Sequence, residues 1–183
     1  MEEDQLSHNI FIKNTYKLLM KRILILLLIL SFNSQVFGAG SDSSGDVKIS
    51  SSADLYKSAV SFIKRAGKLE KKDKNKKAKK LYTQAFKKLE KVHQKDKNNA
   101  DILNYMGFTS RKTGNFDEAE KFYLKGLNLK PNHNGINEYL GELYVQTNRI
   151  EKANERLKVL KGCNCDEYKD LELIIKTKGT KIY

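Results

Sequence analysis

Apolar residues recur at helical spacing through most of the chain after residue 52, with polar residues between them. In residues 100–133, Leu103, Met106 and Ser110 fall on one helical face, and a second face follows after Gly114. That second face carries Ala119, Tyr123, Gly126 and Leu127. Two such faces in succession predict a helical hairpin, because positions three and four residues apart share one side of a helix.

The same hairpin pattern occurs twice in the sequence, at an offset of thirty-four residues. Gly107 corresponds to Gly141 and Ala119 to Ala153, and Lys130-Pro131-Asn132 ends the first unit. The small residues allow two antiparallel helices to approach closely while bulky residues fill the space around them. The offset therefore predicts repeats over residues 100–133 and 134–165.

The repeat period and its residues resemble the tetratricopeptide repeat. The first unit matches that family's pattern at Met106, Gly107, Gly114, Ala119, Tyr123 and Pro131. The second keeps Leu140, Gly141, Tyr144 and Ala153, but has Asn148 in the turn and Cys165 where proline is expected. The resemblance implies an all-α, right-handed superhelical solenoid that acts as a non-catalytic protein-binding module.

Two more helices are expected before these repeats and one after them. Ala66 precedes Ala78 by twelve residues, the same gap as from Gly107 to Ala119, which indicates a degenerate repeat over residues 53–95. Ala66 and Gly107 are forty-one residues apart, seven more than the period, so we expect a long second helix. An apolar stripe in residues 166–177 predicts a helix that caps the solenoid, and residues 178–183 are expected to fray. The expected domain is thus about three helical hairpins plus a cap, over residues 53–177.

The first thirty-eight residues are interpreted as an N-terminal extension and a secretory signal peptide. Lys21 and Arg22 form a basic head before the aliphatic run at residues 23–30, and Gly38 offers a small residue for cleavage. Translation from Met1 and from Met20 both fit. Residues 39–52, rich in Gly, Ser and Asp, are expected to be a flexible linker. We expect a periplasmic or secreted protein, the alternative being an uncleaved membrane anchor.

The chain is basic, with a formal net charge of +13, and the charge is unevenly distributed. Residues 64–97 hold fifteen basic and four acidic residues, whereas the rest of the helical region is nearly balanced. A solvated helical face and a surface for anionic polymers or membranes both fit this run. The candidate basic surface consists of Lys76, Lys77, Lys79 and Lys80.

The sequence shows no set of residues suited to catalysis or to a cofactor. His8, His93 and His133 are not spaced with carboxylates as a metal site or triad, and we interpret His93 and His133 as polar surface residues. No glycine-rich phosphate loop occurs in the helical region. Nucleic acid is disfavoured because export and a basic groove without interleaved aromatics both argue against it.

Cys163 and Cys165 are open to two readings. As free thiols they would pack as small apolar residues at the corner before the cap, which is the interpretation we favour. In an oxidising compartment they are instead a possible redox pair, because a ring closed over one residue is strained and reducible. Two cysteines alone cannot complete a structural zinc site.

The family's geometry places a partner in the concave groove, which the first helices of the repeats line. Carried onto this sequence, that implies a groove formed by Asn104, Phe108, Arg111, Lys112, Glu138 and Glu142. Phe108 is either a binding anchor or a packing residue against the neighbouring helix. The acidic residues depart from the family's carboxylate clamp, so an internal or mixed-charge peptide is expected. The sequence thus predicts a peptide-binding scaffold in the cell envelope. A cationic surface binder is the alternative and a thiol-redox accessory protein a weaker one.

Overall fold

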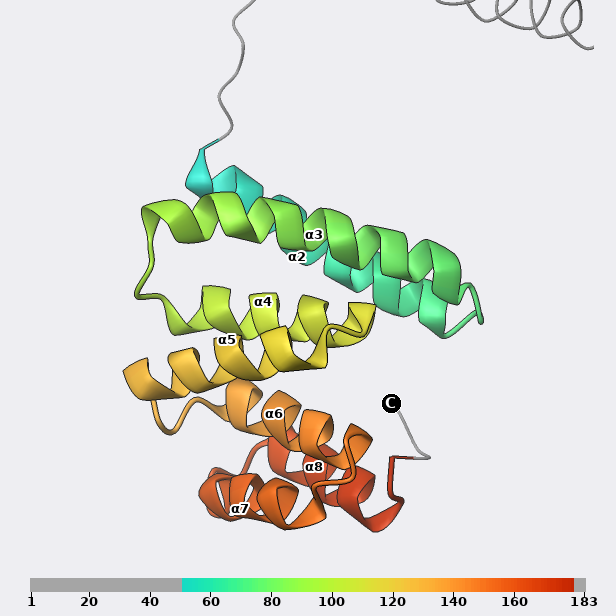
Figure 1. Cartoon of the computed structure of the whole chain (residues 1–183), viewed down its shortest axis with the longest axis vertical. Helices are drawn as coiled ribbons and strands as arrows, with labels where there is room; N and C mark the ends of the chain where they lie inside the picture. The colour runs from blue at the N-terminus through green and yellow to red at the C-terminus, as the bar shows by residue number, and fades with distance from the viewer. Residues whose placement is uncertain (1–50, 180–183) are drawn as a thin grey trace, which may run out of the picture. The chain divides into compact units, whose positions relative to one another are not determined.

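Residues 51–179 are described by a computed structural model and form a stack of antiparallel helices (Figure 1). The predicted signal peptide, its cleavage point and nearly all of the predicted linker lie outside these residues. The helices are α2 (Ser52–Glu70), α3 (Asn75–Lys95), α4 (Ala100–Thr113), α5 (Phe116–Leu129), α6 (Asn134–Gln146), α7 (Ile150–Leu160) and α8 (Asp166–Lys176). No strand occurs among the described residues. The all-α helical repeat solenoid expected from the sequence is confirmed.

The first helix of each hairpin begins at a residue whose side chain caps it. Ser51 forms a reciprocal capping box with Asp54, and the Asn99 side chain accepts hydrogen bonds from the backbone N–H groups of Asp101 and Ile102. His133 accepts from the Ile136 N–H at 3.2 Å, while its Nε2 lies 3.0 Å from Asp101 Oδ1. These contacts satisfy backbone donors that a helix start leaves without partners. His133 is therefore a buried cap, and its interpretation as a surface residue was wrong.

The helices within and between hairpins approach closely where the repeat has small residues. A Cβ atom added to Gly107 would lie 2.5 Å from the ring of Tyr123, and one added to Gly141 would lie 2.6 Å from Leu171. Gly114 ends α4 with a φ of 90°, and Asn148 adopts a φ of 57° at the equivalent turn. Glycine and asparagine are the residues that tolerate this left-handed backbone best.

Both helices of the first hairpin are long, with 19 residues in α2 and 21 in α3, against 14 each in α4 and α5. Ala59 lies eight residues after the cap Ser51, as Gly107 does after Asn99, and Ala59 shares its core cluster with Ala85. The repeat register is therefore set by Ala59 and Ala85, not by Ala66 and Ala78. Compared with the 14-residue helices, α2 is five residues longer and α3 is seven residues longer. The predicted long second helix is α3, which is seven residues longer than α5, whereas the added length of α2 was not predicted.

The added turns carry the α2–α3 tip past the end of the α4–α5 hairpin (Figure 1). We call residues 66–81 the overhang. Ala66, Ala78 and nearby Tyr82 are buried there in a separate small core cluster. Ala66 follows Ala59 by seven residues and Ala78 precedes Ala85 by seven, so the apolar seam continues in phase into the overhang.

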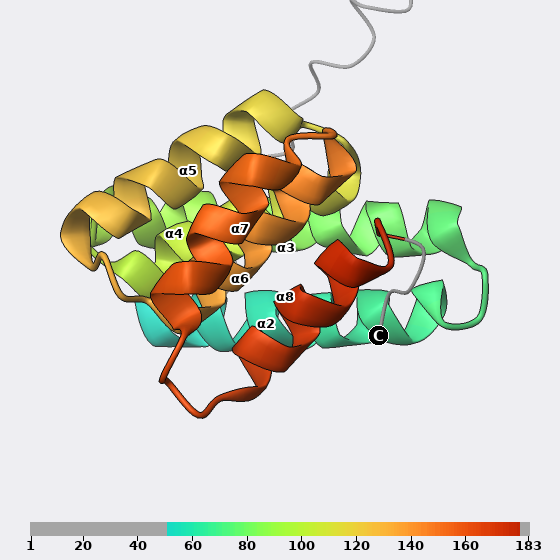
Figure 2. The same ribbon diagram turned by 90° about the horizontal axis from the view of Figure 1, so that it is seen from below.

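Helix α8 lies against α6 and α7 at the other end of the stack (Figures 1 and 2). Leu171 and Ile174 of α8 are buried, with Leu171 packed on Gly141 of α6. This contact covers the apolar face that the last hairpin would otherwise expose.

Candidate functional site

A pocket of about 370 Å³ lies between the overhang, the C-terminal half of α4, and α6. From the two later helices it is lined by Phe108, Arg111, Lys112 and Glu142. The structure thus brings together four of the six groove residues predicted from the sequence. Asn104 and Glu138 are buried, and neither lines the pocket.

The other wall comes from the first hairpin, which the sequence analysis did not include in the groove. It consists of Ile63, Gly67, Glu70, Lys71, Asn75 and Tyr82. Three of these lie on α2 at positions 63, 67 and 70, and Lys71 is the C-cap residue of that helix. This spacing places them on one helical face. That spacing was the available signal, but it identifies a groove face only once the register of the first hairpin is known.

Gly67 stands out among the helical glycines because no backbone or packing constraint accounts for it. A Cβ atom there would meet only the Tyr82 hydroxyl, at 4.0 Å, whereas at Gly107, Gly126 and Gly141 it would collide with a neighbouring side chain. Glycine inside a helix costs roughly 0.5 to 1 kcal/mol relative to alanine. Its effect in this fold is to leave the pocket open on the α2 side.

Phe108 is half-buried and combines the two roles that the sequence left open. Its ring centroid lies 5.8 Å from that of Tyr82, edge to face, and 4.9 Å from that of Tyr139. Phe108 therefore packs against two helices and at the same time forms part of the pocket wall. Aromatic contacts of this geometry stabilise the wall beyond simple burial.

Four of the five charged residues that line the pocket are paired with one another. Arg111 and Glu142 form an ion pair of 2.6 Å with both side chains almost fully buried. Lys112 pairs with Glu70 at 2.7 Å, and Glu70 also accepts a hydrogen bond of 2.9 Å from the Tyr82 hydroxyl. These two ion pairs form an internal network that ties α4 to α2 and α6.

Burial and the nearby Glu70 carboxylate raise the pKa of Tyr82, so this phenol stays a hydrogen-bond donor. The Lys112 ammonium lies 5.7 Å from the Tyr82 ring centroid and 5.9 Å from that of Phe108. Cations at this distance are attracted to the ring face. The pocket thus has an aromatic wall whose polar groups are already positioned.

The candidate basic surface lies outside the pocket. Lys76, Lys77, Lys79 and Lys80 are all exposed on α3, and none of them lines the pocket wall. They nevertheless belong to the overhang, and its turn adds the positive charges of Lys71, Lys72 and Lys74.

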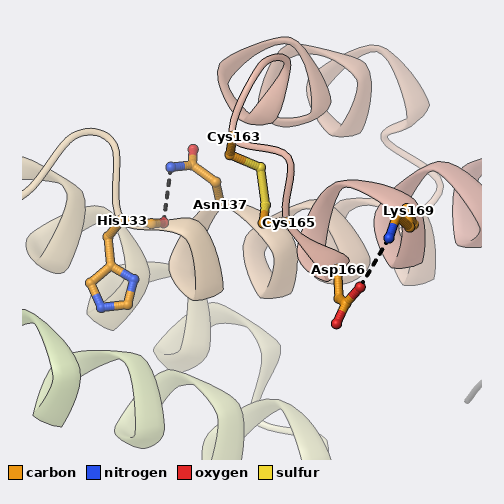
Figure 3. The surroundings of a disulfide bond; sticks show 6 residues. All are labelled: His133, Asn137, Cys163, Cys165, Asp166 and Lys169. Atoms are coloured by element: carbon orange, nitrogen blue, oxygen red, sulfur yellow. Dashed lines mark hydrogen bonds and ion pairs between the residues drawn. A yellow bond between two sulfur atoms is a disulfide. The ribbon is translucent and has the colours of Figure 1, made fainter.

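Cys163 and Cys165 form a disulfide bond in the connection between α7 and α8 (Figure 3). The favoured interpretation as two free packing thiols was therefore wrong. A ring closed over one intervening residue restricts the unfolded chain little, which limits its entropic stabilisation to about 1.6 kcal/mol. The bond thus constrains the corner before α8, and α8 is held by its packing on α6. Redox activity of the pair remains a prediction.

The described part of the chain offers few other groups that could bind a metal or take part in catalysis. Burial and the neighbouring Lys125 lower the pKa of His93, which lies 3.3 Å from that ammonium. Residues 51–179 contain no group of three or more His, Cys, Asp or Glu side chains placed to hold a metal. None of the described helices has the length and hydropathy that a membrane span requires.

Comparison with protein families finds a similarity within the helical region. Residues 77–136 match the model described as tetratricopeptide repeat. This part of the chain is therefore similar to the tetratricopeptide repeat. The matched residues run from α3 to the start of α6, so the tetratricopeptide match includes one helix of the overhang. No curated protein matches the chain.

Several solved structures are similar to this chain. One is the first tetratricopeptide domain of Spaghetti (RPAP3) bound to an HSP90 peptide, with 18% identity, a TM-score of 0.43, and coverage of 67% of this chain and 93% of that one. Another is the Arabidopsis OM64 tetratricopeptide domain, with 15% identity, a TM-score of 0.42, and coverage of 67% and 98%. A third is the Yersinia enterocolitica type III secretion chaperone SycD with a peptide of the translocator YopD, with 17% identity, a TM-score of 0.48, and coverage of 72% and 93%.

Proposed function

We propose that this chain is a non-catalytic interaction module whose groove binds a peptide segment of another protein. The observation that carries the proposal is the pocket where α2, α3, α4 and α6 meet, with apolar and aromatic walls and polar groups already fixed by ion pairs. Concave sites with an apolar wall and a few oriented polar groups are typical binding sites. A tetratricopeptide repeat segment adjoining that pocket is in keeping with this function.

The test is selection of a displayed random-peptide library on the immobilised helical region. Enriched peptides should bind the unmodified chain and lose affinity for the Phe108→Ala variant, which removes part of the wall. The matched comparison is a variant with glutamine at Lys76, Lys77, Lys79 and Lys80, outside the pocket, which should keep peptide binding. Failure to enrich any peptide, or loss of binding in the lysine variant alone, would favour the cationic-surface alternative.

We also propose that the protein works in the cell envelope after export. The support is the basic head, short aliphatic run and small residue at Gly38, all outside the described residues. N-terminal sequencing of the protein from cells should find a chain that begins near Ala39. An intact chain in the membrane fraction would instead favour the uncleaved anchor.

A further inference from the structure

The pocket has a feature that a pair of ordinary repeats would not give it, because one wall belongs to the overhang. Gly67 and Glu70 lie in the part of α2 that extends beyond the length of α4, Lys71 is the C-cap of α2, and Asn75 opens α3. The floor is aromatic, since Tyr82 and Phe108 stack edge to face there. The extension of the first hairpin therefore builds the pocket.

The open volume of about 370 Å³ is large enough to admit an aliphatic side chain, and Gly67 is part of its lining. With no Cβ atom at that position, nothing from α2 fills the space in front of Tyr82 and Phe108. Ile63 lies one turn earlier on the same face and adds an apolar surface. These walls suit an aliphatic side chain better than a charged one, because the nearby Arg111 and Lys112 already have carboxylate partners.

The surroundings of the pocket select for negative charge. Lys64 and Lys68 of α2 and its C-cap residue Lys71 follow one another at spacings of four and three residues. They lie beside the face that carries Ile63 and Gly67. Lys64, Lys68 and Lys71 are exposed and no ion pair is recorded for them among the described residues. We call these three residues the lysine rim. A row of cations beside an apolar pocket favours a ligand with acidic groups on either side of an apolar side chain.

We propose that the overhang pocket binds one aliphatic side chain of an acidic segment in a partner protein, with the flanking carboxylates held by the lysine rim. This proposal rests on the proposed peptide-binding function and names the chemistry of the partner. An acidic protein segment fits better than a membrane or polyanion, since a uniform anionic surface has no apolar side chain that would enter a concave pocket.

The test uses a fluorescently labelled synthetic peptide of Asp, Glu, Ser and Gly with one central Leu, measured by anisotropy. Gly67→Leu places a side chain in the pocket from α2. The change meets no neighbour closer than 4.0 Å at its Cβ, and leucine is the better helix former, so the variant should melt no lower than the unmodified chain. Its affinity for the peptide should fall by at least about tenfold, the effect of losing a buried aliphatic group.

The lysine rim is tested against an equal change of charge elsewhere. Glutamine at Lys64, Lys68 and Lys71 should weaken binding and flatten its dependence on salt. Glutamine at Lys91, Lys95 and Lys97, which are exposed at the opposite end of the hairpin, removes the same charge and should leave binding nearly unchanged. Equal losses in both variants would overturn the rim and show a general effect of net charge.

Changes in the peptide keep the test independent of any effect on folding. Replacing its Leu with Asn, or its acidic residues with Asn and Gln, should each weaken binding to the unmodified chain. Affinity that survives either change overturns the proposal, as does unaltered binding by Gly67→Leu. Anionic phospholipid vesicles that bind equally well to the unmodified and Gly67→Leu chains would show a membrane surface instead. If library peptides lose affinity for Phe108→Ala but bind Gly67→Leu unchanged, the general peptide-binding function stands and the proposal for the overhang pocket is refuted.

Discussion

At the scale of single residues, the glycines of this fold divide by what lies in front of them. Gly107 and Gly141 face Tyr123 and Leu171 so closely that a Cβ atom would overlap them, whereas Gly67 faces open space. The same residue type therefore serves close helix packing at two positions and an open pocket at the third. Substitutions at the two kinds of position should have opposite effects on stability.

Gly107→Leu should destabilise the helical region by about 1 to 3 kcal/mol, because Tyr123 is fully buried and has no room to move. Urea unfolding followed by circular dichroism measures the change. Gly67→Leu is the matched control and should unfold at an unchanged or higher urea concentration. Equal midpoints for the two variants would contradict the packing assignment.

Removing one partner of the Arg111–Glu142 pair should lower the free energy of unfolding more than removing both partners. Arg111→Ala removes the guanidinium that lies 2.6 Å from a buried carboxylate, and breaking a buried pair in this way costs about 3 to 5 kcal/mol. Combining Arg111→Met with Glu142→Leu removes both charges and should restore much of the loss. Thermal melts of the single and double variants measure this coupling. A double variant no more stable than Arg111→Ala would show that the pair is not coupled.

At the scale of the elements, α8 is defined by the face it covers. Truncation after Gly162 removes Leu171 and Ile174 and uncovers the α6 and α7 surfaces beneath them, including Gly141. We expect aggregation or a lower melting midpoint, measured by size exclusion and circular dichroism. The point-mutant comparison is Leu171→Ala, buried, against Leu173→Ala, 40% exposed. The first should cost about 2 to 5 kcal/mol and the second very little.

At the scale of the whole helical region, each hairpin contacts its neighbours, so the two ends have packing on one side only. Native-state hydrogen exchange should therefore be slowest in α4 and α6 and faster in the overhang and α8. Peptide-level mass spectrometry of the exchange measures this order. Uniform exchange across all helices would indicate one cooperative unit.

The sequence was sufficient for the parts of the fold that depend on periodicity. The helix faces and the thirty-four-residue offset follow from small and apolar residues that recur in order, as at Gly107 and Gly141. The register of the first hairpin could not be read in this way. Ala66 and Ala78 have the spacing of a true repeat, but Ala59 lies seven residues before Ala66 and Ala85 lies seven residues after Ala78. Ala59 and Ala85 share a core cluster with the buried residues Ile102 and Met106 of α4, so they set the register.

The candidate site depended more on side-chain partners than on periodicity. Phe108, Arg111, Lys112 and Glu142 were found because the family's groove positions could be transferred to α4 and α6. The ion pair between Arg111 and Glu142 could not be predicted, because it depends on how α4 and α6 are rotated about their axes. The burial of His133 likewise follows from a backbone cap that sequence spacing does not reveal.

Because the apolar seam continues into the overhang at a spacing of seven residues, the length of the overhang can change in steps of seven residues. Seven residues turn an α-helix through two revolutions less about 20°, so one heptad can be removed from each arm while Ala59 and Ala85 still face each other. A deletion far from a whole number of helical turns would rotate the remaining tip relative to this seam. Length change by whole heptads thus gives this helical-repeat fold a way to alter its pocket without changing the packing of the first hairpin.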